Sequence, residues 1–273
     1  MPRFSLVIAT MGRTEELQKL LASIANQRNA DVELIVVDQN DDMRVAPLIA
    51  NLRNGTMVTH LRIAEKNVSL ARNAGLDQAR GDIVAFPDDD CWYPAGLLKQ
   101  VDQWFREHGE YTVLSVGAVD DEGVSSGNRW VQDSCDITPF NSLRTTFCSS
   151  LFIANVPACS VVRFDENMNR GEETDFILRL LAIGLRGRFE RRLHVHHPRR
   201  DMLSGTVSRE RAHSYGAGMG RLVRRHSLFV LWVSLLAYDV ARAALVFLSG
   251  KRADARFCWA HAQGLFQGFV AAP

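Results

Sequence analysis

Three consecutive carboxylates are the residues of this chain best suited to chemistry. Asp88, Asp89 and Asp90 come after Pro87, which follows residues 83–86, an apolar run with the length of a buried strand. Carboxylates this close together repel one another, and a divalent cation turns that repulsion into coordination. Mg²⁺ and Mn²⁺ are held in this way, by one or two carboxylates together with phosphate oxygens of a substrate. The cluster therefore predicts a metal site, with a solvated acidic turn as the alternative.

A second acidic group opens a predicted helix over residues 172–183, which carries apolar side chains at core spacing. Acids in a first turn are favoured by the helix dipole, so helix capping is the simplest explanation. Three acids within four positions, Glu172, Glu173 and Asp175, exceed what capping requires. Glu172 and Asp175 share a helix face, whereas Glu173 points about a third of a turn away. One of them could therefore deprotonate a hydroxyl nucleophile while the others hold the helix start.

Two single residues have weaker signals, and each leaves two interpretations open. Arg72, in a helix predicted over residues 69–79, could reach a phosphate or lie on the helix surface. Asp38 ends the apolar run 32–37 and could accept a hydrogen bond from a nucleobase or cap a turn.

The elements that must position these residues alternate between two kinds, as in a parallel sheet covered by helices on both faces. Strands are predicted over 4–9, 32–37, 57–61, 83–86, 112–116 and 151–162, helices over 14–25, 45–52, 69–79 and 95–107, and a loop over 120–141. Ligands of such sheets bind at the carboxyl ends of the strands. Residues 10–13, 38–42 and 87–92 are therefore expected to meet at one edge.

Composition and charge narrow the class of protein. Lys and Arg number 32 against 31 Asp and Glu, so the net charge of +1 gives no reason to expect nucleic-acid binding. Residues 191–226 hold nine arginines against two acids, a net charge of +7, which leaves a net charge of −6 for the remainder of the chain.

Five cysteines without a C-x-x-C pair argue against a disulfide framework and against structural zinc. The N-terminal apolar run of about six residues is too short for the core of a signal peptide, so a cytoplasmic protein is expected.

Five short motifs follow one another along the chain. They are Ala9-Thr10-x-x-Arg13, the strand ending at Asp38, Asn67-x4-Arg72-Asn73-x-Gly75, Phe86-Pro87-Asp88-Asp89-Asp90 and Gly171-Glu172-Glu173-Thr174-Asp175. In their order and approximate spacing, over residues 4–198, the chain resembles family 2 glycosyltransferases with the GT-A fold. Each motif is unspecific alone, whereas five in order are specific.

The resemblance implies an inverting transfer of a sugar from a nucleotide diphosphate, with UDP as the default, to a hydroxyl of an acceptor. The implied donor-binding residues are Thr10, Arg13, Asp38, Asn67, Arg72, Asp88 and Asp89. The implied ligands of a Mn²⁺ or Mg²⁺ ion are Asp88, Asp90 and His197, the last from a His-His-Pro sequence that resembles the end of the last strand of the fold. In the family the second member of the acidic pair is the base, which implies Glu173 here, with Asp175 as the second choice.

The resemblance also implies an α/β GT-A catalytic domain over residues 1–200, with a central mostly parallel sheet. A basic and apolar helical region follows over 201–273, and within it residues 228–248 are long enough to span a bilayer. The free energy of insertion into a bilayer is close to zero for this segment. Twelve Leu, Val and Phe contribute about −0.5 kcal/mol each, and Asp239 and Arg242 contribute about +3 kcal/mol each. Because these two charges lie three apart and can pair, the pattern favours a helix in the membrane interface over a spanning one. A helix packed on the catalytic domain or in a dimer contact is the alternative.

Together these features predict a metal-dependent inverting glycosyltransferase of polysaccharide or cell-envelope synthesis. We expect it at the inner face of the cell membrane, peripheral or monotopic, with a glycan or lipid-linked acceptor, and as a homodimer if the apolar helices form a subunit contact. Two alternatives use a similar site. The first is a nucleotidyltransferase, but such enzymes usually open with a Gly-rich loop and a lysine, which residues 9–13 lack. The second is a non-catalytic subunit that binds nucleotide sugars. Such a subunit has no need for Glu173, so the presence of this residue argues modestly against it.

Overall fold

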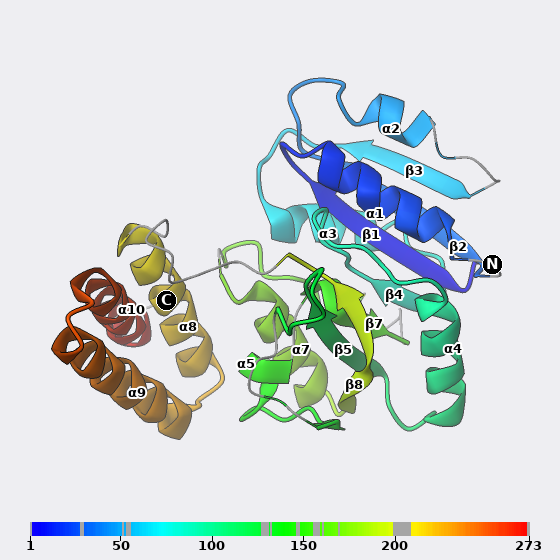
Figure 1. Ribbon diagram of the computed structural model, residues 1–273. Coiled ribbons are helices and arrows are strands. Elements are labelled where there is room, and N and C mark those ends of the chain that lie inside the picture. Colours follow the sequence, from blue (N-terminus) through cyan, green and yellow to red (C-terminus); the bar gives the residue numbers. More distant parts are fainter. Residues whose placement is uncertain are drawn as a thin grey trace. The chain divides into compact units, whose positions relative to one another are not determined.

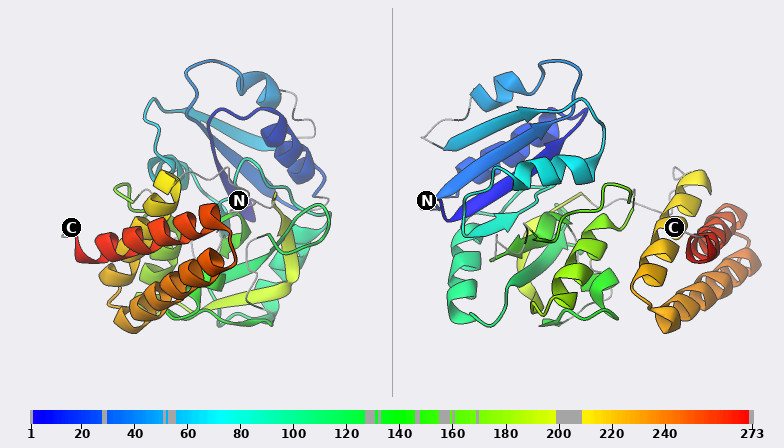
Figure 2. Two further views of the ribbon diagram at one scale, coloured as in Figure 1. Left: turned by 60° about the vertical axis from the view of Figure 1, so that its left-hand side comes forward. Right: turned by 180° about the vertical axis from the view of Figure 1, so that it is seen from behind.

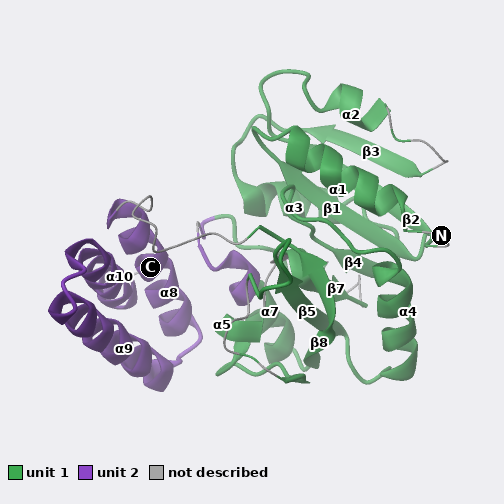
Figure 3. Cartoon of the chain, viewed as in Figure 1, with its two compact units in different colours: residues 1–166, 176–199 green, residues 167–175, 200–273 purple. Residues whose placement is uncertain are grey.

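A computed structural model gives the fold of the chain (Figures 1 and 2). It describes residues 2–27, 30–50, 52, 56–126, 131, 133–145, 148–154, 159, 161–168, 170–198 and 209–271. The chain divides into two compact units (Figure 3), residues 1–166 with 176–199 and residues 167–175 with 200–273. That residues 1–200 and 201–273 are separate domains stays a prediction.

The first unit is built on one eight-stranded sheet with the strand order β3-β2-β1-β4-β7-β5-β8-β6. The strands are β1 (Phe4–Thr10), β2 (Val32–Asp38), β3 (Met57–Arg62), β4 (Ile83–Ala85), β5 (Val113–Val119), β6 (Cys135–Asp136), β7 (Leu151–Ile153) and β8 (Gly187–His196). β1 to β4 are parallel, as are β5 and β8, whereas β7 runs antiparallel between β4 and β5 and β6 is antiparallel to β8. The predicted mostly parallel α/β sheet is confirmed.

Helices cover both faces of this sheet (Figure 1). They are α1 (Glu15–Ala25), α2 (Ala46–Ala50), α3 (Val68–Leu76), α4 (Leu97–Glu107), the short α5 (Ser142–Thr145), the 3₁₀ turn η1 (Cys148–Ser150) and α7 (Glu172–Ala182). α1 and α4 share one apolar layer with the sheet, and α3 shares the other with α7 from Phe176 onward. Because both faces are covered, β1 is apolar from Leu6 to Ala9, with Leu6 and Ile8 in the first layer and Val7 in the second.

The predicted elements agree with the observed ones to within a few residues up to β5. Two differences follow from long-range pairing. The polar stretch 120–141, predicted as a loop, contains β6, which forms because β8 offers it a free edge. The strand predicted over 151–162 is only Leu151–Ile153, since just these residues lie between β4 and β5, and residues 155–158 and 160 lie outside the described part.

An irregularity in β8 shapes the edge at which the strands end. Its register with β5 changes from Val116↔Glu190 to Gly117↔His194, so three additional residues of β8 stand opposite one step of β5. Such bulges re-aim a strand and are frequent beside active sites. Beyond the bulge, the backbones of Trp92 and His196 exchange two hydrogen bonds of 2.9 Å. The end of β8 is thereby fixed alongside the loop that follows β4.

In its described part, the second unit contains the helices α8 (Arg209–Arg225), α9 (Phe229–Leu248) and α10 (Arg252–Val270), together with residues from the segment 167–175. α8 and α10 pack backbone to backbone. A Cβ added at Gly216 or Gly264 would lie 2.1 Å from a backbone oxygen of the other helix. Glycines four residues apart on both helices, Gly216 and Gly220 on α8 and Gly264 and Gly268 on α10, permit this approach.

α9 packs on α10 through an aromatic pair and a polar pair. Trp232 stacks on Phe269 with ring centres 4.2 Å apart, and His261 Nδ1 lies 2.6 Å from Asp239 Oδ2. Asp239 on α9 therefore pairs with His261 on α10 and not with Arg242 on its own helix. The predicted pairing of Asp239 with Arg242 is wrong. The reason is that the face of α9 carrying Asp239 is the buried one.

The remaining surface of α9 is apolar and exposed. Among the described residues it is the one helix long and apolar enough to cross a membrane, and 6% of its most apolar window is buried. Val230, Leu245 and Leu248 are 70%, 68% and 80% exposed. Residues 209–271 carry nine Lys and Arg against three Asp and Glu, a net charge of +6. This unit thus combines an exposed apolar helix face with a basic surface.

Substituting alanine for Gly216 or Gly264 should destabilise the second unit. The new methyl group would force α8 and α10 apart, and overpacking of this kind costs about 1–3 kcal/mol, which outweighs the gain of about 1 kcal/mol in helix propensity. Urea unfolding followed by the Trp232 fluorescence measures the loss. Gly109→Ala is the control, since no atom lies within 4 Å of a Cβ there. A Gly216→Ala protein as stable as the control would show that the two helices do not approach so closely in solution.

Candidate active site

The acidic loop Asp88–Asp90 lies at the carboxyl end of β4, and its three side chains point to different partners. Asp89 faces the end of β1: Thr10 Oγ1 donates to its Oδ2 at 2.8 Å, and Arg13 donates to its Oδ1. Arg13 also reaches Asp90, with 2.8 Å between Nη2 and Oδ2. Burial raises the pKa of Asp89, against the effect of Arg13. The two carboxylates raise the pKa of Arg13, although burial opposes this.

Asp88 faces α3 and the turn before β7. Arg72 Nη2 lies 3.0 Å from its Oδ1, and Ser149 Oγ donates to its Oδ2 at 2.6 Å. Arg72 is buried and its guanidinium lies 5.3 Å from the centre of the Phe164 ring. The sequence left open whether Arg72 lies on the helix surface. It does not, because its side chain is buried and points into the acidic loop.

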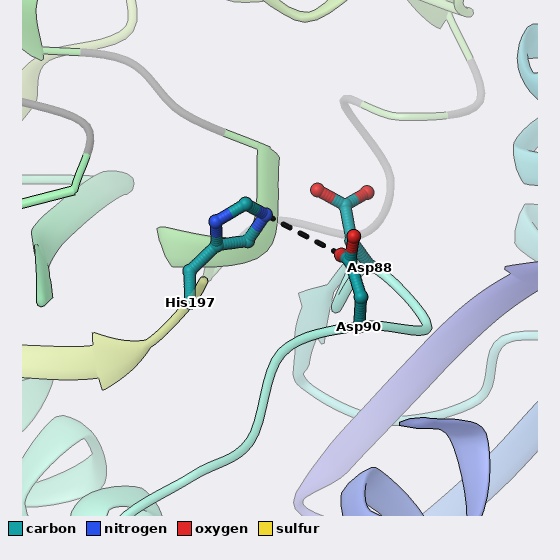
Figure 4. A group of neighbouring side chains, drawn as sticks. All are labelled: Asp88, Asp90 and His197. Atoms are coloured by element: carbon teal, nitrogen blue, oxygen red, sulfur yellow. Dashed lines mark ion pairs between the residues drawn. The ribbon is translucent and has the colours of Figure 1, made fainter. Parts of the chain in front are cut away.

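Asp88, Asp90 and His197 form a group with one candidate ligand atom each, all within 4.8 Å of one another (Figure 4). His197 Nε2 lies 3.3 Å from Asp90 Oδ1, and its Nδ1 lies 2.9 Å from the carbonyl oxygen of Pro198. A carbonyl can only accept, so Nδ1 carries the proton and Nε2 is directed at the carboxylates. A metal-binding histidine usually has this arrangement, with the other ring nitrogen donating to a carbonyl or carboxylate.

The spacing and chemistry of this group fit a divalent ion. The three candidate ligand atoms lie within 4.8 Å of one another, close enough for one ion to be bound among them. One imidazole and two carboxylates suit Mn²⁺ better than Mg²⁺, which is bound mainly through oxygens. Among the described residues, the three carboxylates of the loop lie near two guanidiniums, those of Arg13 and Arg72.

The ends of β1 and β2 also meet, as the strand pattern predicts. Gln39 N donates to Thr10 O at 3.0 Å, and Gly12 N donates to Asn40 Oδ1 at 2.7 Å. Asp38 is fully buried, and its Oδ1 accepts from the backbone and side-chain nitrogens of Asn40 at 2.9 and 2.7 Å. His60 Nε2 lies 3.1 Å from its other oxygen. Asp38 therefore caps a turn, one of its two predicted roles, and its contact with a nucleobase stays a prediction.

Asn67 has a structural role at the start of α3. Its Oδ1 accepts from the backbone nitrogens of Ser69 and Leu70 at 2.9 and 3.2 Å, while its Nδ2 donates to Glu166 O at 2.7 Å. It is an N-cap of the preferred type. Its predicted place in donor binding stays a prediction.

The two candidate bases, Glu173 and Asp175, lie in the first turn of α7 but in different surroundings. Asp175 is fully buried, with Oδ1 2.9 Å from His226 Nε2 and 3.4 Å from Arg225 Nε. Glu173 is half-buried. The position of Asp175 is thus determined by contacts with the end of α8.

Several residues of the site escaped the sequence analysis. Ser149 reaches Asp88 because the antiparallel β7 enters between β4 and β5, and no local motif signals this. Asn40 and His60 could have been found from their positions at the ends of β2 and β3. His226 lies 51 residues after its partner Asp175, and only the packing of α8 joins them.

A cavity of about 750 Å³ lies elsewhere in the first unit. It is lined by Arg3, Gly81, Asp82 and Thr112, among others, at the amino-terminal ends of β1, β4 and β5. Since the acidic loop follows the carboxyl end of β4, this cavity is at the opposite edge of the sheet from the candidate site.

Residues 5–169 match the model of the family described as Glycosyl transferase family 2. The chain belongs to this family. It is a glycosyltransferase, and curated relatives are named accordingly. The chain is 27% identical over 181 residues to the GalNAc(5)-diNAcBac-PP-undecaprenol beta-1,3-glucosyltransferase of Campylobacter jejuni, across 64% of this chain and 58% of that protein. It is 26% identical over 261 residues to the succinoglycan biosynthesis protein ExoM of Rhizobium meliloti, across 88% of this chain and 84% of that protein.

Solved structures of other glycosyltransferases have the same fold. TarS residues 1–349 of Staphylococcus aureus superpose with a TM-score of 0.61 at 16% identity, covering 97% of this chain and 90% of that chain. The mannosyltransferase PcManGT of Pyrobaculum calidifontis superposes with a TM-score of 0.67 at 13% identity, covering 98% of this chain and 87% of that chain. These likenesses confirm the expected GT-A fold of family 2, and at such identities they show the fold alone.

Proposed function

We propose that this family 2 enzyme transfers a sugar, with inversion and with the help of a divalent metal, from a nucleotide diphosphate to an acceptor hydroxyl. The observation that carries the proposal is the convergence of Asp88, Asp90 and His197 at the carboxyl ends of the strands, beside Arg13 and Arg72. A metal bound there, preferably Mn²⁺, would neutralise the donor diphosphate. Arg72 then stabilises the charge that grows on the leaving group.

For the nucleotide, UDP is the first candidate. TarS has been solved in complex with UDP and with UDP-GlcNAc, and PcManGT with GDP-Man and Mn²⁺. Thr10 and Arg13 contact the acidic loop, and Asp38 and Asn67 lie at the end of β2 and at the start of α3. These residues would hold the nucleotide of such a donor.

Glu173 is the proposed general base. Asp175 is the less suitable of the two acids because it is fully buried. Glu173 is half-buried in the same helical turn, where it can take a proton from an acceptor hydroxyl. A single displacement with a base on the acceptor side inverts the configuration and needs no second nucleophilic carboxylate.

The proposed acceptor is a glycan or lipid-linked glycan, met at the inner face of the cell membrane. The name of the Campylobacter relative specifies a substrate on PP-undecaprenol. In this chain, α9 exposes an apolar face, and residues 209–271, which include α9, carry a net charge of +6. Apolar helix faces flanked by Lys and Arg bind in the interface of anionic membranes.

A thermal-shift screen of nucleoside diphosphates with and without Mn²⁺ tests the proposed donor and metal. Ligand at a hundredfold excess over Kd stabilises a protein by about 2.7 kcal/mol, enough to rank UDP, GDP and dTDP. We expect the largest rise in Tm with UDP and Mn²⁺ together. The proposal is wrong if no nucleotide raises Tm more with Mn²⁺ than without it.

Liposome flotation tests the membrane surface. Leu245→Glu and Leu248→Glu should each lower the partition coefficient onto anionic vesicles by roughly tenfold or more, because burial of a leucine contributes about 1.5–3 kcal/mol. High salt should release only part of the wild-type protein, since salt screens the basic residues but not the apolar contact. Ile183→Glu is the control, an exposed apolar residue of the first unit. Equal flotation of all variants would refute a role for α9 in membrane binding.

A further inference from the structure

The segment that leads into the acidic turn of α7 lies along one face of α8. The guanidinium of Arg170 lies 4.4 Å from the centre of the Tyr215 ring. A Cβ at Gly218 would be 2.5 Å from the Cβ of Arg170, so the backbones are in close contact there. Leu222, fully buried, lies next to Gly171, where a Cβ would be 3.8 Å from Leu222 Cδ2.

The contact residues of α8 are spaced as one helix face. One stripe on α8 contains residues at intervals of three or four, namely Tyr215, Gly218, Leu222 and Arg225. His226 directly follows the last residue of the helix. A different stripe, with Gly216 and Gly220, packs on α10. α8 is therefore held between α10 and the segment 168–175.

The end of this stripe holds the carboxylate of Asp175. His226 Nε2 lies 2.9 Å and Arg225 Nε 3.4 Å from Asp175 Oδ1, and Asp175 is fully buried. A buried carboxylate is costly unless it is paired and hydrogen-bonded. These contacts therefore favour one placement of the turn Glu172–Asp175 over others in which Asp175 would lose its partners.

We infer that His226, assisted by Arg225, is a positioning residue of the transfer reaction, which acts by holding Asp175 and thereby the turn that carries Glu173. The inference rests on the proposed function, in which Glu173 is the base. Glu173 precedes Asp175 by two residues in the same turn, so a shift of Asp175 moves both. A displacement of about 1 Å at a reacting group can cost about 10² in rate. The helices of the second unit thus serve catalysis as well as membrane binding.

The test compares full-length wild type with His226→Ala, His226→Gln and Arg209→Ala. The glutamine amide can donate to Asp175 in place of the imidazole, and Arg209 is an exposed residue at the far end of α8. kcat and the dissociation constant of the donor are measured with UDP-sugar and Mn²⁺, and amide hydrogen exchange is followed over residues 168–175.

For His226→Ala we expect kcat to fall about 10²-fold, an unchanged donor dissociation constant, and faster exchange over 168–175. His226→Gln should recover at least tenfold of the lost kcat, and Arg209→Ala should behave as wild type. The inference is overturned if kcat of His226→Ala stays within twofold of wild type, if glutamine rescues nothing, or if donor binding falls in parallel with kcat. A wild type that transfers no sugar would refute the proposed function instead, and unchanged exchange in His226→Ala would still refute the inference.

Discussion

Replacing Asp90 with alanine should abolish the Mn²⁺-dependent binding of UDP. Asp90 is buried between Arg13 and His197, and it shares the proposed ligand group with Asp88. Two remaining ligands cannot hold the ion against water. Loss of even a residue that supports a metal ligand typically costs 10- to 100-fold in affinity, so loss of a ligand should cost at least about 100-fold.

Asp88→Ala should have a smaller effect of the same sign. Asp88 is only half-buried and is also bound by Arg72 and Ser149, which would remain to hold the diphosphate. Calorimetric titration of UDP with and without Mn²⁺ measures both variants. The control is Asp31→Ala, an exposed aspartate directly before β2, at the other edge of the sheet. If both variants bind UDP with wild-type affinity, the acidic loop is not part of the donor site.

The second large effect is expected at the proposed base. Glu173→Gln should bind UDP and Mn²⁺ as wild type does and lose about 10²- to 10⁴-fold in kcat, because general-base assistance typically contributes that much. The amide has nearly the shape of the carboxylate but cannot accept the proton. Initial rates of transfer at saturating donor give kcat, and calorimetry gives the donor affinity.

Two further variants separate the base from its neighbours. Glu172→Gln, in the same helical turn, should keep most of the activity. Asp175→Asn should lower Tm, because its buried contacts with His226 and Arg225 lose their charge. If instead Asp175→Asn folds normally and is inactive while Glu173→Gln turns over, Asp175 is the base. If Glu173→Gln loses donor binding together with turnover, the acidic turn is structural.

The sequence alone determined the parts of this protein that depend on local patterns. Alternating apolar runs and helical segments predict the strands β1 to β5, because a strand buried on both faces must be apolar along its length. The position of Asp88–Asp90 after such a strand predicts the edge of the sheet at which the site lies, since parallel strands end together. The contacts of Thr10 and Arg13 with this loop show that the two segments meet at this edge, as expected, and the function of the edge stays a proposal.

The tertiary structure decided which side chains of each motif meet. Asp89 turns to Thr10 and Arg13, and Asp88 turns to Ser149. Asp90 lies 3.3 Å from His197, which follows β8. Glu173 and Asp175 look equivalent in the sequence, and only the packing of α8 buries Asp175 against His226. Asp239 likewise binds His261 of α10 and not its neighbour Arg242. In each case the partner lies far along the chain, so the direction of the side chain depends on which surfaces pack together, and local spacing does not encode this.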